Sequence, residues 1–310
     1  MIYTITFNPS LDYYVKVNNL KSGIVNRTAT EYITVGGKGL NVSLALKELG
    51  DESFAYGFVA GFTGNAIDEK VTAMGLEHEF LKVGGQSRIN VKIKSTTETD
   101  INGLGAIVSE DDVARLISSL KTRLKEGDWL VICGSVPSTL DDRTYENLLK
   151  KLKPLKNINV VVDACGALLT NTLKYRPFLI KPNIFELSEI FGLKTLPNTK
   201  EIAACARELQ KQGARNVICS MGGDGALYVT DSEIIYAEGL KVPVGSTVGA
   251  GDSVVASLAV AEEAGMSLPE TVRLSTATGA ANVMCSGTQA AEYSVIEELL
   301  PKVVFRPIEI

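Results

Sequence analysis

A glycine turn that carries an aspartate, Gly249-Ala250-Gly251-Asp252, lies in the last quarter of the 310-residue chain, between a β-branched run and an apolar stretch. The two glycines let backbone N–H groups face a ligand, and the helix expected from Ser253 points its positive dipole end at the same place. The turn therefore predicts a site for an anion such as a phosphate. The presence of Asp252 in such a site requires an explanation, because its negative charge repels a phosphate.

Asp252 has two interpretations. As a general base, it would take the proton of a sugar hydroxyl while that hydroxyl attacks a phosphoryl group held by the turn. As a structural residue, it would cap the following helix, which is a common use of aspartate after glycine. The tetrapeptide alone favours the cap, so the choice depends on the rest of the chain.

A second glycine-rich segment, Gly36-Gly37-Lys38-Gly39, precedes a predicted helix that ends at Gly50. Glycines and a lysine before a helix suit a sugar or phosphate group close to the backbone, and Asn41 in the first turn is placed to donate to the same ligand. The spacing matches neither a Walker A motif nor Gly-x-Gly-x-x-Gly. It therefore indicates neither a P-loop NTPase nor a dinucleotide enzyme.

Polar residues on two predicted strands are further candidates for a sugar ligand. Asp12 follows the first strand, and its carboxylate can accept bonds from sugar hydroxyls or satisfy the turn at Asn8-Pro9. Alternation places Arg88, Asn90 and Lys92 on one face of a later strand. Such a face suits a sugar phosphate, although a solvated face is the commoner use.

The elements that must position these residues follow an α/β pattern. Residues 54–81 read as strand, turn, helix and strand, and Val160-Val161-Val162 is typical of a parallel strand buried on both faces. Half-exposed strands within about 12–35 and 88–103 cannot join such a sheet. We therefore expect one domain, residues 1–310, that carries a separate antiparallel lid.

Composition limits the class of protein. The chain is 45% hydrophobic and 22% charged, as in an ordinary soluble globule, and its net charge of −5 argues against a nucleic-acid or anionic-membrane surface. The five cysteines form no CxxC pair, and the N-terminus lacks the features of a signal peptide. We expect a cytoplasmic protein without membrane or nucleic-acid partners.

Seven segments together resemble, nearly end to end, the carbohydrate kinases of the PfkB family, the ribokinase-like group. They are Asn8-Pro9-Ser10-Leu11-Asp12, Gly36-Gly37-Lys38-Gly39-Leu40-Asn41-Val42, Arg88-Ile89-Asn90-Val91-Lys92, Gly134-Ser135-Val136-Pro137, Lys181-Pro182-Asn183-Ile184-Phe185-Glu186, Ser220-Met221-Gly222-Gly223-Asp224-Gly225-Ala226 and Thr247-Val248-Gly249-Ala250-Gly251-Asp252-Ser253. The resemblance implies a ribokinase-like three-layer α/β sandwich with a mostly parallel central sheet and a small antiparallel β-sheet lid. It also implies ATP and Mg²⁺ as cofactors, and a homodimer through the lid.

The resemblance implies a role for each candidate. It makes Asp252 the base and the backbone of Gly249, Ala250 and Gly251 the anion site. For the substrate it implies Asp12, Gly36, Gly37, Lys38, Asn41, Arg88, Asn90, Ser135 and, by rough alignment, Arg27. For ATP it implies Lys181, Ser220, Gly222, Gly223, Gly225 and Asn282. Asn183 and Glu186 would order Mg²⁺ through water, although their spacing is also that of an ordinary helix cap.

Within this family, the segments at 8–12, 88–92 and 247–253 favour phosphorylation of fructose 1-phosphate at its C6 hydroxyl. The alternative substrate is tagatose 6-phosphate, whose kinases more often carry serine where Ala250 stands. Lys38, Arg88 and Lys92 around one pocket argue against a neutral sugar or a nucleoside.

Two other classes of protein fit less well. A sugar-phosphate-binding regulator without catalysis would not need Asp252, Lys181 and Glu186, and all three are present. A nicotinamide oxidoreductase would need a glycine fingerprint after the first strand, where this chain has Asn8-Pro9.

Overall fold

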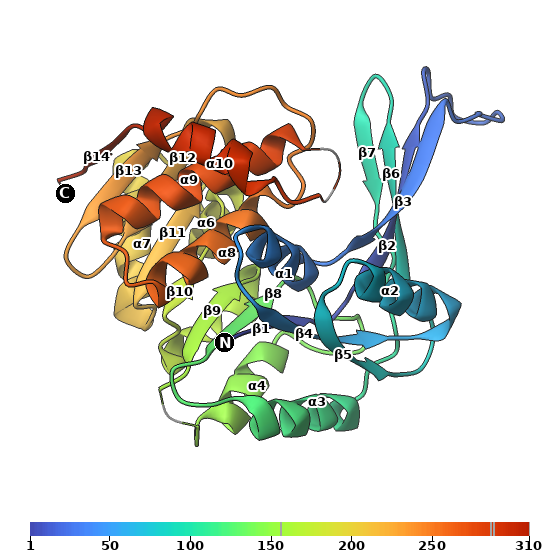
Figure 1. Ribbon diagram of the computed structural model, residues 1–310, viewed down its shortest axis with the longest axis horizontal. Coiled ribbons are helices and arrows are strands. Elements are labelled where there is room, and N and C mark those ends of the chain that lie inside the picture. Colours follow the sequence, from blue (N-terminus) through green and yellow to red (C-terminus); the bar gives the residue numbers. More distant parts are fainter. Residues whose placement is uncertain (156, 286, 288, 310) are drawn as a thin grey trace.

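The computed structural model describes residues 1–155, 157–285, 287 and 289–309, and it shows a large sheet covered by helices beside a small separate sheet (Figure 1). Within these ranges the large sheet has ten strands in the order β14-β13-β12-β11-β10-β9-β8-β1-β4-β5. They are β1 (Ile2–Thr6), β4 (Ser53–Val59), β5 (Glu77–Lys82), β8 (Trp129–Cys133), β9 (Asn159–Asp163), β10 (Leu179–Ile180), β11 (Asn216–Ser220), β12 (Gly225–Val229), β13 (Ile234–Glu238) and β14 (Phe305–Pro307).

Parallel pairing joins neighbouring strands in the series β11, β10, β9, β8, β1, β4 and β5. Strands β12, β13 and β14 continue the sheet beyond β11 with antiparallel pairing. Strands β1 and β8 are buried at every residue, as expected of apolar strands that are covered on both faces. The predicted mostly parallel central sheet is confirmed. Because the parallel strands point the same way, their carboxyl ends meet at one edge.

Two layers of helices cover the sheet, so the predicted sandwich is also confirmed. The face that carries Ile2, Val131 and Val161 packs against α1 (Lys38–Glu48), α2 (Gly61–Ala73), α8 (Ala250–Glu263) and α9 (Leu268–Met284). The opposite face, with Ile5, Ile132 and Val162, packs against α3 (Glu110–Arg123), α4 (Thr144–Leu152), α5 (Gly166–Thr170), α6 (Ile184–Phe191) and α7 (Thr199–Gln212). Helix α10 (Tyr293–Leu299) packs on α9, and short 3₁₀ turns lie at Leu173–Tyr175, Gly222–Asp224 and Leu300–Lys302.

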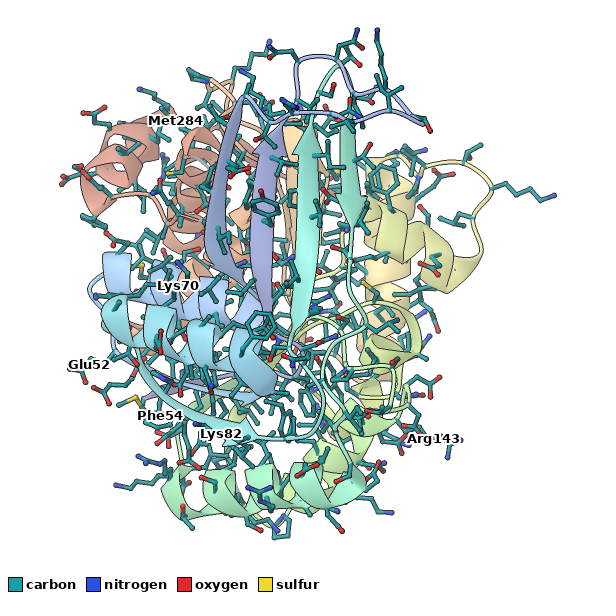
Figure 2. The ribbon with its side chains drawn as sticks, turned by 90° about the vertical axis from the view of Figure 1, so that its right-hand side faces the viewer. Glu52, Phe54, Lys70, Lys82, Arg143 and Met284 are labelled. Carbon is teal, nitrogen blue, oxygen red and sulfur yellow. The ribbon has the colours of Figure 1, made fainter. Side chains whose placement is uncertain are left out.

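The small sheet is the predicted lid, which stands away from the body of the molecule in Figure 1 and shows its strands side by side in Figure 2. Its order is β3 (Thr30–Gly36), β2 (Ser10–Lys16), β6 (Arg88–Lys94) and β7 (Glu98–Ile101). The outer pairs are antiparallel as expected, but the central pair β2–β6 is parallel, so the expectation of a fully antiparallel lid was wrong. The reason is that β2 follows β1 and β6 follows β5, and both leave the same edge of the parallel sheet.

None of the helices in the described ranges is long and apolar enough to cross a membrane. All five cysteines are free, as expected from their spacing. Cys133 and Cys219 are buried in the core, whereas Cys165 is exposed.

Candidate active site

Asp252 lies in the first turn of α8 and is 5% exposed. Its Oδ2 accepts a hydrogen bond of 2.8 Å from Asn41 Nδ2 on α1. The helix begins after Gly249, which has a φ of 81° and makes no side-chain cap bond. The aspartate is therefore directed toward a neighbouring helix, which favours the base over the cap.

The environment of Asp252 sets its basicity near neutral pH. Burial raises its pKa to about 6, the charges of Lys38 and Lys181 oppose this rise, and the charge of Asp163 adds to it. A base acts best when its pKa lies close to the working pH. The buried carboxylate is thus suited to accept a proton from a hydroxyl.

The anion turn is packed against a lysine. Lys181 follows β10 and is 3% exposed, and a Cβ atom added at Gly251 would lie 3.0 Å from its Nζ. A side chain at position 251 would therefore push the ammonium group out of its place by a few tenths of an ångström. The turn and Lys181 together present backbone N–H groups and a cation at the N-terminus of α8.

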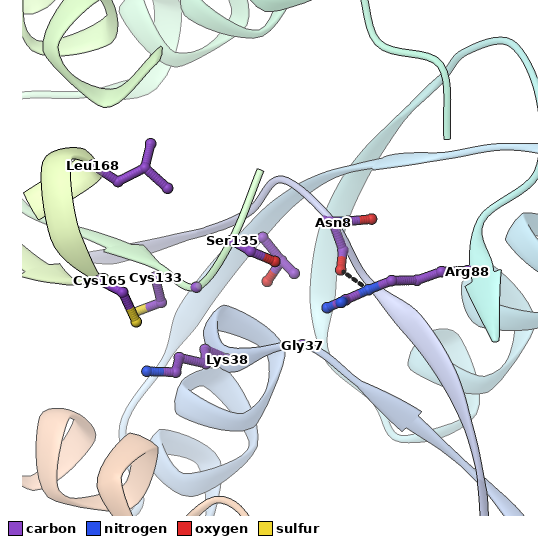
Figure 3. Close-up of a pocket in the computed structure, with 10 residues that line it drawn as sticks. Asn8, Gly37, Lys38, Arg88, Cys133, Ser135, Cys165 and Leu168 are labelled. Atoms are coloured by element: carbon purple, nitrogen blue, oxygen red, sulfur yellow. Dashed lines mark hydrogen bonds between the residues drawn. The ribbon is translucent and has the colours of Figure 1, made fainter. Parts of the chain in front are cut away.

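A cavity of about 270 Å³ lies at the carboxyl edge of the sheet beneath the lid (Figure 3). Its lining includes four predicted substrate residues and is made of Thr6, Asn8, Gly37, Lys38, Arg88, Cys133, Gly134, Ser135, Cys165 and Leu168. Arg88 Nε donates to Asn8 O at 3.0 Å, which fixes the guanidinium at the base of the lid. Residues far apart in the sequence thus form one basic pocket.

The inner face of the lid carries the predicted sugar contacts. Asp12 is buried, and its Oδ1 accepts from Ser10 Oγ at 2.7 Å and from Asn90 Nδ2 at 2.8 Å. A Cβ at Gly36 would lie 2.5 Å from Asp12 Oδ2, so glycine is needed beside the carboxylate. Lys92 shares this face but pairs with Asp100 at 2.6 Å, an ion pair across the β6–β7 hairpin.

The predicted magnesium residues form a helix cap. Asn183 Oδ1 accepts from the backbone of Phe185 and Glu186, and Glu186 Oε2 accepts from Asn183 N at 2.8 Å. Glu186 Oε1 accepts from Cys165 Sγ at 2.9 Å, and burial first, then Glu186, raises the pKa of that thiol to about 12. Both residues lie near the cavity, and a role through water stays a prediction.

Four of the predicted nucleotide residues lie beyond the cavity lining, on β11, on the 3₁₀ turn after it and at the start of β12. Ser220 ends β11 and forms a bridge with Asn183, and Gly222 and Gly223 begin the 3₁₀ turn that follows. A Cβ at Gly223 would meet open space, whereas one at Gly225 would collide with the backbone of β13. Packing against β13 therefore explains why position 225 holds a glycine, and the contact of Gly225 with ATP stays a prediction.

Asn282 on α9 supports the anion turn. Its Nδ2 donates to Val248 O at 3.1 Å, and its Oδ1 accepts from Ser253 Oγ at 2.9 Å. The side chain is 3% exposed. The structure gives Asn282 this supporting contact, and its contact with ATP stays a prediction.

Arg27 lies outside the cavity and away from the other predicted substrate residues. It is exposed in the loop between β2 and β3, at the far end of the lid. There it lines a separate hollow with other residues of the segment 17–29. The predicted contact of Arg27 with the substrate came from a rough alignment, which does not give the distance of a residue from the pocket.

Sequence reasoning missed Asp163, which ends β9 and is fully buried. Its Oδ1 lies 3.1 Å from Lys38 Nζ, and its Oδ2 lies 3.4 Å from Lys181 Nζ. The available signal was an aspartate at the carboxyl end of an apolar parallel strand, where α/β proteins place ligand residues.

The fold, the basic cavity and the aspartate at the anion turn define a phosphotransferase of the ribokinase-like type. The chain belongs to the pfkB family of carbohydrate kinases, whose sequence pattern matches residues 6–294. It is 40% identical to a 1-phosphofructokinase of Bacillus subtilis (strain 168) over 98% of each chain. It is 36% identical to a D-tagatose-1-phosphate kinase of Bacillus licheniformis, over 93% of this chain and 94% of that one.

A solved structure of phosphofructokinase-2 from Escherichia coli in complex with potassium is similar in fold. It aligns with a TM-score of 0.90 at 27% identity, over 97% of this chain and 98% of that chain. The chain is therefore a kinase of this family, and membership implies ATP as the phosphoryl donor.

Proposed function

We propose that this kinase transfers the γ-phosphoryl group of ATP to the C6 hydroxyl of fructose 1-phosphate and so forms fructose 1,6-bisphosphate. The observation that carries the proposal is Asp252, a buried carboxylate with a pKa of about 6 at an anion-binding turn. Near-full-length similarity to 1-phosphofructokinases supports the choice of substrate. The five free thiols fit a reducing cytoplasm, where we place this activity.

In the proposed reaction, Asp252 accepts the proton of the C6 hydroxyl while the oxygen of that hydroxyl attacks the γ-phosphorus of ATP. The bond from that phosphorus to the bridging oxygen of ADP breaks, and ADP leaves with the electron pair. Backbone N–H groups of the turn and the ammonium of Lys181 stabilise the charge of the transferred group. Lys38 and Arg88 line the cavity as the cations for the sugar's own phosphate.

Mg²⁺ is part of the proposal through Asn183 and Glu186. Carboxylate and amide oxygens suit this ion, but the cap already uses them for N–H and S–H donors. Among the residues described, no group of three or more His, Cys, Asp or Glu side chains would hold a metal directly. The donor set therefore fits a hydrated ion, which would neutralise charge on the nucleotide phosphates when bound.

Tagatose 1-phosphate is the second candidate substrate, because a D-tagatose-1-phosphate kinase is 36% identical to this chain. It differs from fructose 1-phosphate only in the configuration at C4. Both sugars offer a C1 phosphate to Lys38 and Arg88 and a C6 hydroxyl to Asp252. Tagatose 6-phosphate, the alternative expected from the sequence, carries its phosphate at the other end of the sugar.

A coupled assay of ADP release with ATP and Mg²⁺ tests the proposal. It compares kcat/KM for fructose 1-phosphate, tagatose 1-phosphate, tagatose 6-phosphate, fructose 6-phosphate and ribose. We expect the highest value for fructose 1-phosphate. A higher value for either tagatose phosphate would keep the mechanism and replace the substrate. Binding of phosphosugars without any turnover would refute the kinase proposal and favour a sugar-phosphate-binding regulator without catalysis.

We also propose that two chains associate through their lids. The face of the lid away from Asp12 and Asn90 carries a row formed by Ile33, Tyr13, Val91 and Ile101, which lie side by side across all four strands. Ile33 is 47% exposed and Ile101 is 57% exposed. An apolar sheet face of this kind needs cover, and a second copy of the lid offers a matching surface.

A further inference from the structure

Asp163 lies at the centre of a buried charge cluster beneath the proposed reaction. The carboxylate bridges Lys38 on one oxygen and Lys181 on the other, at 3.1 Å and 3.4 Å. Its Oδ2 makes no hydrogen bond within the described part of the chain. Burial favours the protonated acid, but Lys181 and Lys38 outweigh burial and hold the pKa of Asp163 below its ordinary value.

The two lysines come from different elements and face different parts of the site. Lys38 begins α1 and lines the cavity proposed for the sugar. Lys181 follows β10 and lies against Gly251 of the anion turn. One fully buried carboxylate therefore joins the cation on the sugar side to the cation on the phosphoryl side.

We propose that Asp163 is a positioning residue, which holds Lys38 and Lys181 on either side of the transferred phosphoryl group and away from the carboxylate of Asp252. This inference rests on the proposed function. The ammonium group of Lys181 is buried and needs a counter-ion, whereas the side chain of Lys38 is half-buried. Without Asp163, the carboxylates that remain within electrostatic range of Lys38 are Asp252 and Glu186, and a base that gains an ion pair is a weaker base.

The charges around Asp252 give the direction of the effect. Lys38 faces it from α1, Asp163 from β9 and Lys181 from the segment after β10, and the thiol of Cys133 on β8 also lies within electrostatic range. Asn41 donates a hydrogen bond to it. The negative charge of Asp163 raises the pKa of Asp252, so neutralising Asp163 must lower it.

The test is Asp163→Asn, which removes the charge and keeps the shape. We expect kcat with fructose 1-phosphate to fall about 100-fold, because both cations lose their anchor. The ¹³C signal of the Asp252 carboxyl, assigned by its loss in Asp252→Asn, should titrate about one pH unit lower than in the wild type. That titration needs no substrate and reports the charges around Asp252, whereas the loss of kcat reports the position of the two cations.

Asp128→Asn is the matched control. Asp128 is also a buried carboxylate, but it precedes β8 at the opposite edge of the sheet and lies 3.5 Å from the N-terminal amine. It should change neither kcat nor the Asp252 titration. A kcat within 3-fold of wild type in Asp163→Asn, or an unchanged Asp252 midpoint, would overturn the positioning role.

A second pair of variants serves if Asp163→Asn does not fold. Lys181→Met is compared with the double variant Asp163→Asn/Lys181→Met, which removes the anion together with one of its cations. The double variant should show the lower Asp252 midpoint, and equal midpoints would overturn the inference. If the wild type instead fails to phosphorylate fructose 1-phosphate, the proposed function fails, and the titration still tests whether Asp163 controls the charge of Asp252.

Discussion

A carboxylate that acts as a base must stay deprotonated at the working pH although burial favours its protonated form. Asp252 meets this condition narrowly, with a pKa of about 6. We expect Asp252→Asn to lower kcat about 100- to 10,000-fold and to leave KM within about 3-fold, because the amide keeps the shape and loses the basicity. Steady-state kinetics with fructose 1-phosphate measure this. Equal losses in kcat and in affinity would contradict the role as base.

The raised pKa also predicts how activity and stability depend on pH. Activity should rise with pH and level off above about pH 6, because the deprotonated form of Asp252 reacts.

The pKa of Asp252 in the folded protein lies above the ordinary value of 3.8, so the ionised carboxylate lowers the free energy of unfolding above pH 6. This loss of stability disappears as pH falls toward 3.8. We expect Asp252→Asn to raise the free energy of unfolding at pH 8 by about 1–3 kcal/mol. Chemical denaturation at pH 8 and at pH 4.5 measures the difference, and an equal gain at both values would refute it.

At the scale of elements, the anion turn depends on the contact between α8 and α9. Asn282→Ala removes the bonds to Val248 and Ser253, which should cost about 1–3 kcal/mol of stability. The turn then loses its fixed geometry, so we also expect kcat to fall about 10-fold or more. Kinetics and thermal unfolding are measured together.

Asn216→Ala is the control for that change. Asn216 Nδ2 donates to Phe178 O at 3.0 Å, at the amino end of β11 and far from the turn. This variant should lose stability and keep its kcat. If both asparagine variants keep kcat, the turn does not depend on Asn282.

At the scale of the whole molecule, association of two lids predicts the effect of a surface charge. Ile89 is 44% exposed on the outer lid face, so Ile89→Lys should convert a dimer into monomers in sedimentation velocity. Stability of the single chain should change by no more than about 0.5 kcal/mol. Val304→Lys, at a 58% exposed site beside β14, should leave the dimer intact. A monomeric wild type at micromolar concentration would refute the association.

The sequence predicted what depends on local motifs and strand ends. Lys38, Arg88 and Ser135 do line one cavity, and the lid does form a separate sheet. The parallel pairing of β2 with β6 was not predictable from either strand, because pairing follows from where both leave the body. Asp163 was missed because its burial and its two lysine partners arise only when β9, β10 and α1 come together.

The lid is a sheet attached to the body at one end, so a rotation about that end moves its tip most. Strand β2 has seven residues, so at about 3.3 Å per residue its tip lies roughly 23 Å from its base. A rigid rotation of roughly 10° about that base would move the tip by about 4 Å but the buried Asp12, two residues from it, by only about 1 Å. Small adjustments around a bound sugar are thus magnified at the loop of residues 17–29. A fluorophore on that loop should therefore report whether the pocket is occupied.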